Sequence, residues 1–538
     1  PSDRVKSFRQ RFYIYMMLTA PSERLIITYP RTGSDGKGVN KSYLIDTIEN
    51  MFELKLTHVE ERSVEDRMHT KTEAYRLMLQ LMAKVRDEGL DCLEEEDRLW
   101  LEKLVSYFGE DEKEYNQLLE QVFFTYKPNP FSEEIMLAIN ECFNEDETVR
   151  GSVTKFETFA KCGFRYFMDY VLKTRDRELY ELSYMDIGNC YHAAIERYCS
   201  LITENNEDWH KLDGKTIEHY SKEAIDYAVE TMPKSASNLD AVQKHILEGM
   251  KETLSFCMKN LTWQVQEGLF DPTFFEEPVT NELVNPVSGE RNAIVHGKID
   301  RIDLHHTDKS VGVRIVDYKS SAREFSASDC FYGLSMQLPM YMSFAVEKLK
   351  EKYPNLEVNP SAFLYYHVDD PMVAGNAQMD IDALRIKERT LKGLIVDDEL
   401  NLQANDTKLE AGRNSEVVKV SLKKDGNPGV HSDVVSNDDM KTILEYAKVN
   451  GALLSEDILG GKFEPIPVCI GGKSCHYCPY TSVCRFNPGV PGTMVRVCAN
   501  LSKDDAIGLM REQLDYIKEN GQAKPVVTLA EVKTDEMD

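Results

Sequence analysis

The chain has no uninterrupted apolar run approaching about 18 residues, so no segment of it is expected to cross a membrane. Its first residues, PSDRVKSFRQRF, lack the basic and then apolar pattern of a signal peptide, which favours a cytoplasmic protein. Basic side chains are outnumbered: 64 Lys and Arg stand against 91 Asp and Glu, a net charge of −27 over 538 residues. This charge argues against non-specific coating of nucleic acid but leaves room for a local basic groove.

A phosphate-binding loop is also missing. The pattern GxxxxGK(S/T) does not occur, and the GGKS at 471–474 fails because Pro467 occupies the position of the first glycine. We therefore expect no ATP hydrolysis by this chain. What is present is enough apolar material to build cores, with 42% hydrophobic and 9% aromatic residues over a length that suits two to four domains.

The spacing of apolar residues predicts mostly helices as far as about residue 268 and a change to strands from about 290. The exception in the first part is LIITY at 25–29, which is predicted to be a short buried strand. AIVHGKIDRIDL and GVRIVDYKSS, separated by the polar HHTDKSV, predict a β-hairpin. A helix at LSMQLPMYMSFAVEKL and a strand at SAFLYYHV should follow, and the polar stretch 521–538 is expected to be frayed.

Three polar residues lie on the expected hairpin. Asp300 belongs to its first strand, and Asp317 and Lys319 belong to its second. Residues i and i+2 of a strand share a face, so Asp317 and Lys319 point the same way, and pairing can bring Asp300 to them. Two carboxylates and a lysine suit Mg²⁺-assisted phosphodiester hydrolysis, in which the metal activates a water and the lysine orients it. Taken alone, such residues are more often strand-end caps or surface ion pairs.

Two helices add polar residues at a spacing of four. Gly188, His192 and Glu196 share one helix face, where His192 can serve as a metal ligand beside a close approach at Gly188. Gln337 and Tyr341 share a face of the helix after the hairpin and can hydrogen-bond a phosphate or a base edge. A lone histidine on a helix is more often simply packed, so specificity comes from the order GxxxH, GxID, DYK, QxxxY.

In that order, the segments GNCYH (188–192), GKIDRID (297–303), DYKSS (317–321) and QLPMY (337–341) resemble the RecB-type branch of the PD-(D/E)xK nucleases. The flanking sequences, YGLSMQLPMY and YYHVDDP, are more similar still to the second subunits of bacterial AddAB-type helicase–nucleases, which resect double-strand breaks for recombination. The resemblance implies an α/β fold with a restriction-endonuclease-like core and helical additions. It also implies DNA and an AddA-like helicase–nuclease subunit as partners, the latter in a heterodimer.

The resemblance also implies roles for single residues. His192, Asp300 and Asp317 would bind Mg²⁺, with Mn²⁺ as a possible substitute, and Lys319 would be the catalytic lysine. Gln337 and Tyr341 would support the DNA or the geometry of the site. Asp303 is a second candidate ligand, ranked below Asp300 because Asp300 fills the GxID position. In this group of subunits the nuclease cuts the strand that ends 5′, while the partner carries the motor.

The twelve cysteines are unevenly spread, with Cys475, Cys478 and Cys484 inside ten residues. In a cytoplasmic chain such clustering favours metal ligation over disulfides. By spacing alone, a zinc site of four cysteines, or of three with His476, competes with an iron–sulfur cluster, and Cys469 lies close enough to be a false candidate.

The resemblance favours iron–sulfur at these cysteines. It makes them the C-terminal part of a [4Fe–4S] staple whose first ligand lies far upstream, and Cys162 occupies that place. The family often has proline after this cysteine, where this chain has Gly163. The staple's role would be structural, because it would tie together ends of the nuclease that are distant in sequence.

The N-terminal MMLTAPSERLIITY resembles the last conserved motif of UvrD-like helicases, with Ala20 in place of the arginine that contacts the nucleotide in active members. This gives four expected parts: the C-terminal remnant of an inactive helicase-like domain (1–45), an acidic helical linker (46–148), the nuclease with its staple (149–500), and a C-terminal helix with a polar tail (501–538). The chain is thus expected to begin within a degenerate helicase half.

Two other functions remain open at this point. The chain could be a structural, DNA-holding subunit with a silent nuclease site, although it keeps every expected catalytic residue. It could also be a stand-alone nuclease of the same branch, although the helicase-like motif near its start argues against this.

Overall fold

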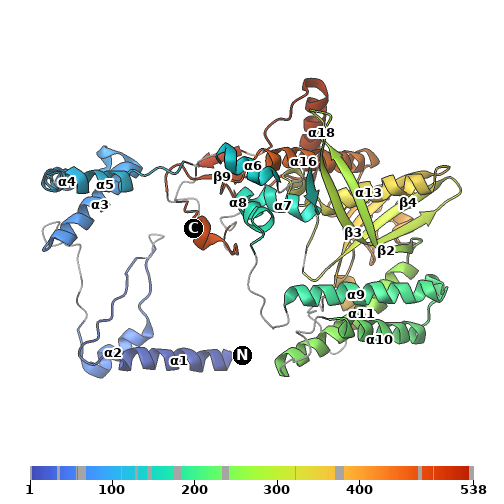
Figure 1. The fold of residues 1–538 in the computed structure, drawn as a ribbon. Coiled ribbons are helices and arrows are strands. Elements are labelled where there is room, and N and C mark those ends of the chain that lie inside the picture. Colours follow the sequence, from blue (N-terminus) through green and yellow to red (C-terminus); the bar gives the residue numbers. More distant parts are fainter. Residues whose placement is uncertain are drawn as a thin grey trace. The chain divides into compact units, whose positions relative to one another are not determined.

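The computed structural model describes residues 3–32, 37–55, 57, 68–110, 112–127, 131–141, 148–174, 183–232, 241–321, 323–369, 381–469, 475, 477–488, 490–526 and 528–531 (Figure 1). The chain divides into two compact units, Pro1–Phe124 and Thr125–Asp538. The four-part division expected from the sequence is finer than this and stays a prediction. Among the helices that are described, none combines the length and apolar character needed to cross a bilayer.

The first unit is helical, as the spacing of its apolar residues predicts. Its helices are α1 (Asp3–Thr19), α2 (Tyr43–Phe52), α3 (Lys71–Glu88), α4 (Glu95–Phe108) and α5 (Glu112–Val122). Leucine, methionine and phenylalanine side chains of α3, α4 and α5 form its core. The strand predicted at 25–29 is wrong: Leu25, Ile26 and Ile27 are exposed and pair with no other described strand, so no ladder holds the segment.

The second unit is built on a mixed seven-stranded sheet in the order β1-β3-β4-β5-β6-β7, with β2 pairing β3. The strands are β1 (Val149–Gly151), β2 (Asp271–Val284), β3 (Arg291–His306), β4 (Ser310–Lys319), β5 (Glu357–His367), β6 (Lys392–Val396) and β7 (Val434–Val435). The predicted hairpin is confirmed, because β3 and β4 pair antiparallel with Arg301 opposite Val316. The strand predicted at SAFLYYHV is β5, which runs parallel to β4.

Helices cover both faces of this sheet (Figure 1). One face packs against α7 (Val153–Lys161), α13 (Gln337–Lys352), α16 (Asn437–Leu459) and α18 (Lys503–Asn520), and the other against α9 (Tyr184–Glu204), α10 (Gly214–Glu230) and α11 (Ala241–Gln266). The described part of the unit also contains α6 (Glu133–Glu141), α8 (Gly163–Tyr166), α12 (Ala327–Phe331), α14 (Ile381–Glu388), α15 (Glu399–Asn405) and α17 (Thr481–Cys484), together with the π-helical turn η3 (Phe167–Val171) and the 3-10 turn η4 (Trp209–Lys211). The predicted α/β class is confirmed.

The alternation of side chains along β4 assigns its residues to the two faces. Ile315 belongs to the core under α13, whereas Val316 and Tyr318 belong to the core under α9. Asp317 and Lys319 therefore lie on the α13 face, as the i, i+2 argument predicts.

The C-terminal region departs from its prediction. The stretch 521–538 is predicted to be frayed, but Thr528–Glu531 forms strand β10. It pairs antiparallel with β9 (Met494–Val497), which in turn pairs with β8 (Val468–Cys469). Strand pairing is made by backbone hydrogen bonds, so a polar segment can form a strand when a partner strand lies beside it.

A fully buried ion network lies three residues beyond Asp300 in β3. Asp303 Oδ2 accepts from Arg314 Nε at 2.9 Å and from Arg301 Nη2 at 3.1 Å. Arg301 Nε also lies 2.8 Å from Oδ1 and Arg314 Nη2 lies 2.8 Å from Oδ2, and all three side chains are at most 1% exposed. Arg314 also donates to Asn405 and stacks over the ring of Phe270. The carboxylate of Asp303 is thus committed to two guanidinium groups, which makes it a core residue and removes it as a metal ligand.

Replacing this carboxylate should destabilise the second unit. Asp303→Asn leaves two buried arginine charges facing a neutral amide, so we expect the free energy of unfolding to fall by about 3–5 kcal/mol. Urea denaturation of the full chain measures it. Asp308→Asn, in the exposed turn of the same hairpin, is the matched control and should change stability by no more than about 0.5 kcal/mol. Equal stability of the two variants would contradict the assignment.

Candidate active site

The site begins where β3 and β4 part. Their ladder ends at the pair Arg301 and Val316, and beyond it the side chain of Asp300 takes over: Oδ2 accepts the backbone N–H of Tyr318 at 2.7 Å. This bond fixes the Asp300 carboxylate beside the strand that carries Asp317 and Lys319. The sequence prediction that the hairpin brings these three residues together agrees with this arrangement.

Gln337, the first residue of α13, connects Asp317 and Lys319 of β4. Its Nε2 donates to Asp317 Oδ1 at 2.9 Å, and its Oε1 accepts from Lys319 Nζ at 3.3 Å. Lys319 Nζ also lies 2.6 Å from Asp317 Oδ2. One amide therefore sets the relative positions of a buried carboxylate and an ammonium group, which gives Gln337 a positioning role.

A second group of ligands lies next to the first. His192 Nδ1, on α9, is 3.4 Å from Asp300 Oδ2 and 3.6 Å from Glu276 Oε1. Within the described ranges, these three residues each offer a ligand atom within 4.8 Å of the other two. Imidazole nitrogen with two carboxylate oxygens is a donor set suited to a divalent cation. Asp317 stands outside this group, so the expected triad of His192, Asp300 and Asp317 is not one tight cluster.

Glu276 is the site residue that the sequence patterns did not reveal. It lies in β2, in the run PTFFEEPV, where neither strand alternation nor a motif distinguishes it from Glu277. Its backbone has φ = 46°, the left-handed region that residues other than glycine rarely adopt. This kink within a strand is what a change of side-chain direction requires, and such strained residues concentrate at functional sites.

The electrostatics of the site reflect crowded carboxylates. Burial disfavours the charged form of His192, but the neighbouring Asp300 and Glu276 carboxylates outweigh it and raise the pKa of the imidazole to about 10. Burial and the charge of Asp300 raise the pKa of Asp317, while Lys319 acts in the opposite direction. Burial and a neighbouring carboxylate therefore disfavour the charged form of Asp317, a condition that a bound divalent cation relieves.

Tyr341 explains the glycine of the GxID motif. A Cβ at Gly297, on β3, would collide with the hydroxyl of Tyr341 and lie 2.8 Å from the ring carbon that carries it. Glycine at 297 thus lets α13 approach the sheet and bury Tyr341 near Asp317 and Asp300, which together with burial raise the pKa of its hydroxyl. The close approach predicted at Gly188 is wrong, because a Cβ there would meet open space.

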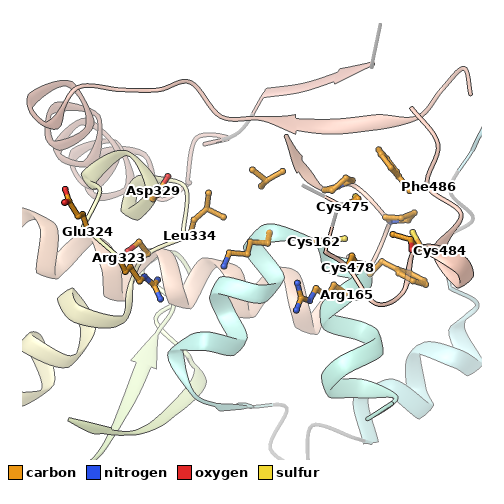
Figure 2. A pocket seen from close by; sticks show the side chains of 17 residues that line it. Cys162, Arg165, Arg323, Glu324, Asp329, Leu334, Cys475, Cys478, Cys484 and Phe486 are labelled. Atoms are coloured by element: carbon orange, nitrogen blue, oxygen red, sulfur yellow. The ribbon is translucent and has the colours of Figure 1, made fainter. Parts of the chain in front are cut away.

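The four predicted cysteine ligands line one cavity of about 450 Å³. Figure 2 shows Cys162, at the end of α7, facing the segment with Cys475, Cys478 and Cys484, while Arg323, Glu324 and Asp329 lie toward the other end. Residues more than 300 positions apart in the sequence therefore meet, as the staple requires. Gly163 also has a reason: the carbonyl of Lys462 passes 2.5 Å from the place of a Cβ, so a proline there would clash.

The chemistry of these thiols suits a bound metal group. Burial raises the pKa of Cys162 and of Cys484, and the neighbouring thiols raise both further, so unliganded thiolates are disfavoured and a cationic centre would reverse this. A zinc ion holds sulfurs about 3.8 Å apart, given Zn–S bonds of about 2.3 Å. In the described part of the chain, no three of these cysteines have their sulfur atoms all within 4.8 Å of one another. His476 and the side chain of Cys469 lie outside the described residues.

Fold and site together define a class of protein. The family model of the PD-(D/E)XK nuclease superfamily matches residues 150–485, which is well over half of the chain. The chain therefore belongs to the PD-(D/E)XK nuclease superfamily. The matched region contains β3, β4 and α13, and it spans the helix that carries His192.

Curated relatives narrow the likeness further. The chain is 28% identical to a protein of Lachnoclostridium phytofermentans, 26% to one of Clostridioides difficile and 26% to one of Clostridium tetani. Each is named as the B-type subunit of an ATP-dependent helicase/deoxyribonuclease, which is the AddB type that the sequence resemblance indicated. The matches cover 94–96% of this chain but only 44–45% of the relatives. The chain thus spans less than half the length of these relatives.

The two motif glycines make a matched pair for a test. Gly297→Ala should force Tyr341 to move and lower the free energy of unfolding by about 1–3 kcal/mol, as overpacking does. Gly188→Ala, in the interior of α9 with free space around it, should be neutral or stabilising by up to about 1 kcal/mol. Chemical denaturation checks both. Addition of Tyr341→Ala should offset part of the loss in Gly297→Ala, and fully additive losses would contradict the proposed contact.

Proposed function

We propose that the chain is a Mg²⁺-dependent deoxyribonuclease subunit that hydrolyses phosphodiester bonds in DNA. The observation that supports this is the convergence of His192, Glu276 and Asp300 beside the linked set Asp317, Lys319 and Gln337. These side chains come from α9, β2, β3, β4 and α13, and packing of the core does not require so many polar groups to meet at one place.

His192, Asp300 and Asp317 would hold the metal, with Glu276 as an additional ligand from β2. The bound cation would supply charge for the scissile phosphate and acidify a water. Lys319 lies 2.6 Å from Asp317, so its ammonium group can orient that water and balance phosphate charge. Gln337 holds Asp317 and Lys319 in register, and Tyr341 fills the space under Gly297, so both shape the site.

We propose further that the chain acts within a helicase–nuclease complex as an exonuclease in repair of double-strand breaks, cutting the strand that ends 5′. The names of the curated relatives, which are subunits, support a partner, and an AddA-like motor subunit fits that role. The absence of a phosphate-binding loop from the sequence supports a chain without ATPase activity of its own. A subunit that processes breaks in chromosomal DNA would be located in the cytoplasm, where a bacterial chromosome lies.

At the cavity that the clustered cysteines line, we propose a structural [4Fe–4S] cluster on Cys162, Cys475, Cys478 and Cys484. Four thiols around one cavity match the usual ligand count of such a cluster. Among the described residues no three of these sulfurs lie within 4.8 Å of one another, which favours the larger group over a single zinc ion.

The nuclease proposal is tested on Lys319 and Asp317. We expect Asp317→Asn and Lys319→Met to reduce cleavage of linear DNA in the presence of Mg²⁺ by at least about 10²-fold, because the first weakens a proposed metal ligand and the second removes the group that orients the reacting water. Lys309→Met, in the exposed turn of the same hairpin, is the control and should cleave like the wild type. Circular dichroism should show all three folded.

A folded wild-type protein without cleavage under Mg²⁺ or Mn²⁺ would favour the other function, a DNA-holding subunit with a silent site. Cleavage by Lys319→Met equal to that of the control would remove the lysine assignment. Co-purification with an AddA-like subunit separates a subunit of a complex from a stand-alone nuclease.

The cluster proposal is tested by colour and metal content. Protein purified without oxygen should be brown, with broad visible absorption and about four iron atoms per chain. Cys478→Ser should lose the colour and the iron because one ligand is gone, whereas Cys92→Ser, in the first unit, should keep both. Colourless protein that contains zinc would contradict the proposal.

A further inference from the structure

One buried carboxylate near the site is not explained by the chemistry above. Glu157, in α7, is 3% exposed, and its Oε1 accepts the backbone N–H groups of Met336 and Gln337 at 2.8 and 3.1 Å. These groups open α13, where Met336 makes no capping bond with its own side chain. The first N–H groups of a helix lack partners within the helix, so Glu157 acts as a cap supplied by another element.

The other oxygen of Glu157 faces a cation. Arg323, which follows β4, places a guanidinium nitrogen 3.6 Å from Glu157 Oε2. Arg323 and Lys319 both lie over the ring of Tyr365, at 5.7 and 5.9 Å from its centroid. The buried charge of Glu157 is therefore balanced by a helix terminus and one arginine.

This cap acts on Gln337, the residue whose side chain fixes the positions of Asp317 and Lys319 on β4. Glu157 fixes the backbone of Gln337, and the side chain of Gln337 holds both Asp317 and Lys319. We infer that Glu157 is a positioning residue for catalysis, which sets the place of Lys319 through Gln337. This inference rests on the proposed nuclease function and adds to it a residue that acts through a helix terminus rather than on the reacting groups.

The test compares three substitutions in the full chain with Mg²⁺ and DNA at saturation. Glu157→Ala removes the acceptor, and kcat should fall at least about tenfold, since small misplacements of a catalytic group cost up to about 10²-fold. Glu157→Gln keeps an oxygen acceptor for both N–H groups and should retain most of kcat. Glu157→Asp, whose side chain is one methylene shorter, should give an intermediate loss of kcat. This variant replaces Glu157→Ala in the comparison if Glu157→Ala does not fold.

A purely structural role is separated by two further measurements. Asn292, another buried polar residue of the same unit, donates to Ala452 O at 2.7 Å and takes no part in the contacts of Gln337 described above. Asn292→Ala should lose stability while its kcat stays at the wild-type value. In a Gln337→Ala background, Glu157→Ala should lower kcat by less than about twofold, because the residue through which it acts is already gone.

The inference is overturned if Glu157→Ala retains the wild-type kcat, or if its loss is as large in the Gln337→Ala background as in the wild type. It is also overturned if Glu157→Gln loses as much kcat as Glu157→Ala, because the acceptor would then not be what matters. An inactive wild-type protein would overturn the proposed function itself. An active wild type that loses cleavage in Lys319→Met but keeps its kcat in Glu157→Ala would overturn this inference alone.

Discussion

The arrangement of the site depends on the carboxylate of Asp300. A strand ladder normally continues through backbone bonds, but here the side chain of Asp300 accepts the N–H of Tyr318 in place of a backbone carbonyl. The same oxygen lies 3.4 Å from His192 of α9. This one oxygen of Asp300 thus contacts both β4 and α9. Because β3 and β4 separate at this point, the other polar side chains of the site have room to converge there.

Two aspartates three residues apart in GKIDRID differ in what their carboxylates can bind, because their positions along the strand pairing differ. Asp300 lies where the strands part and keeps a partly accessible environment, with 10% of its side chain exposed. Asp303 lies inside the ladder, and Arg301 and Arg314 enclose it completely. The same chemical group is available to a ligand in one position and serves the core in the other, because only the first lies at the end of the paired region.

Most of the second unit could be predicted because its signals are local. The hairpin, the helix with Gln337 and the place of Asp317 and Lys319 follow from periods of two and four residues. Glu276 could not be predicted, since a kink at φ = 46° and the approach of α9 bring it into the site, and neither is encoded in a short pattern. Segments 25–29 and 528–531 show the same limit in opposite directions: the first pairs with no strand among the described residues, and the second pairs with β9.

Helix α7 contacts two different parts of the unit, one from its middle and one at its C-terminal end. It carries Glu157, which caps α13, and it ends at Cys162, which faces the other three clustered cysteines. A helix of nine residues is about 13 Å long and resists bending, so it behaves as a short rigid lever. A sideways shift at Cys162 would be transmitted to Glu157, five residues earlier, rather than absorbed within the helix. The position of Lys319 would then depend on how firmly the cavity with the clustered cysteines holds the Cys162 thiol.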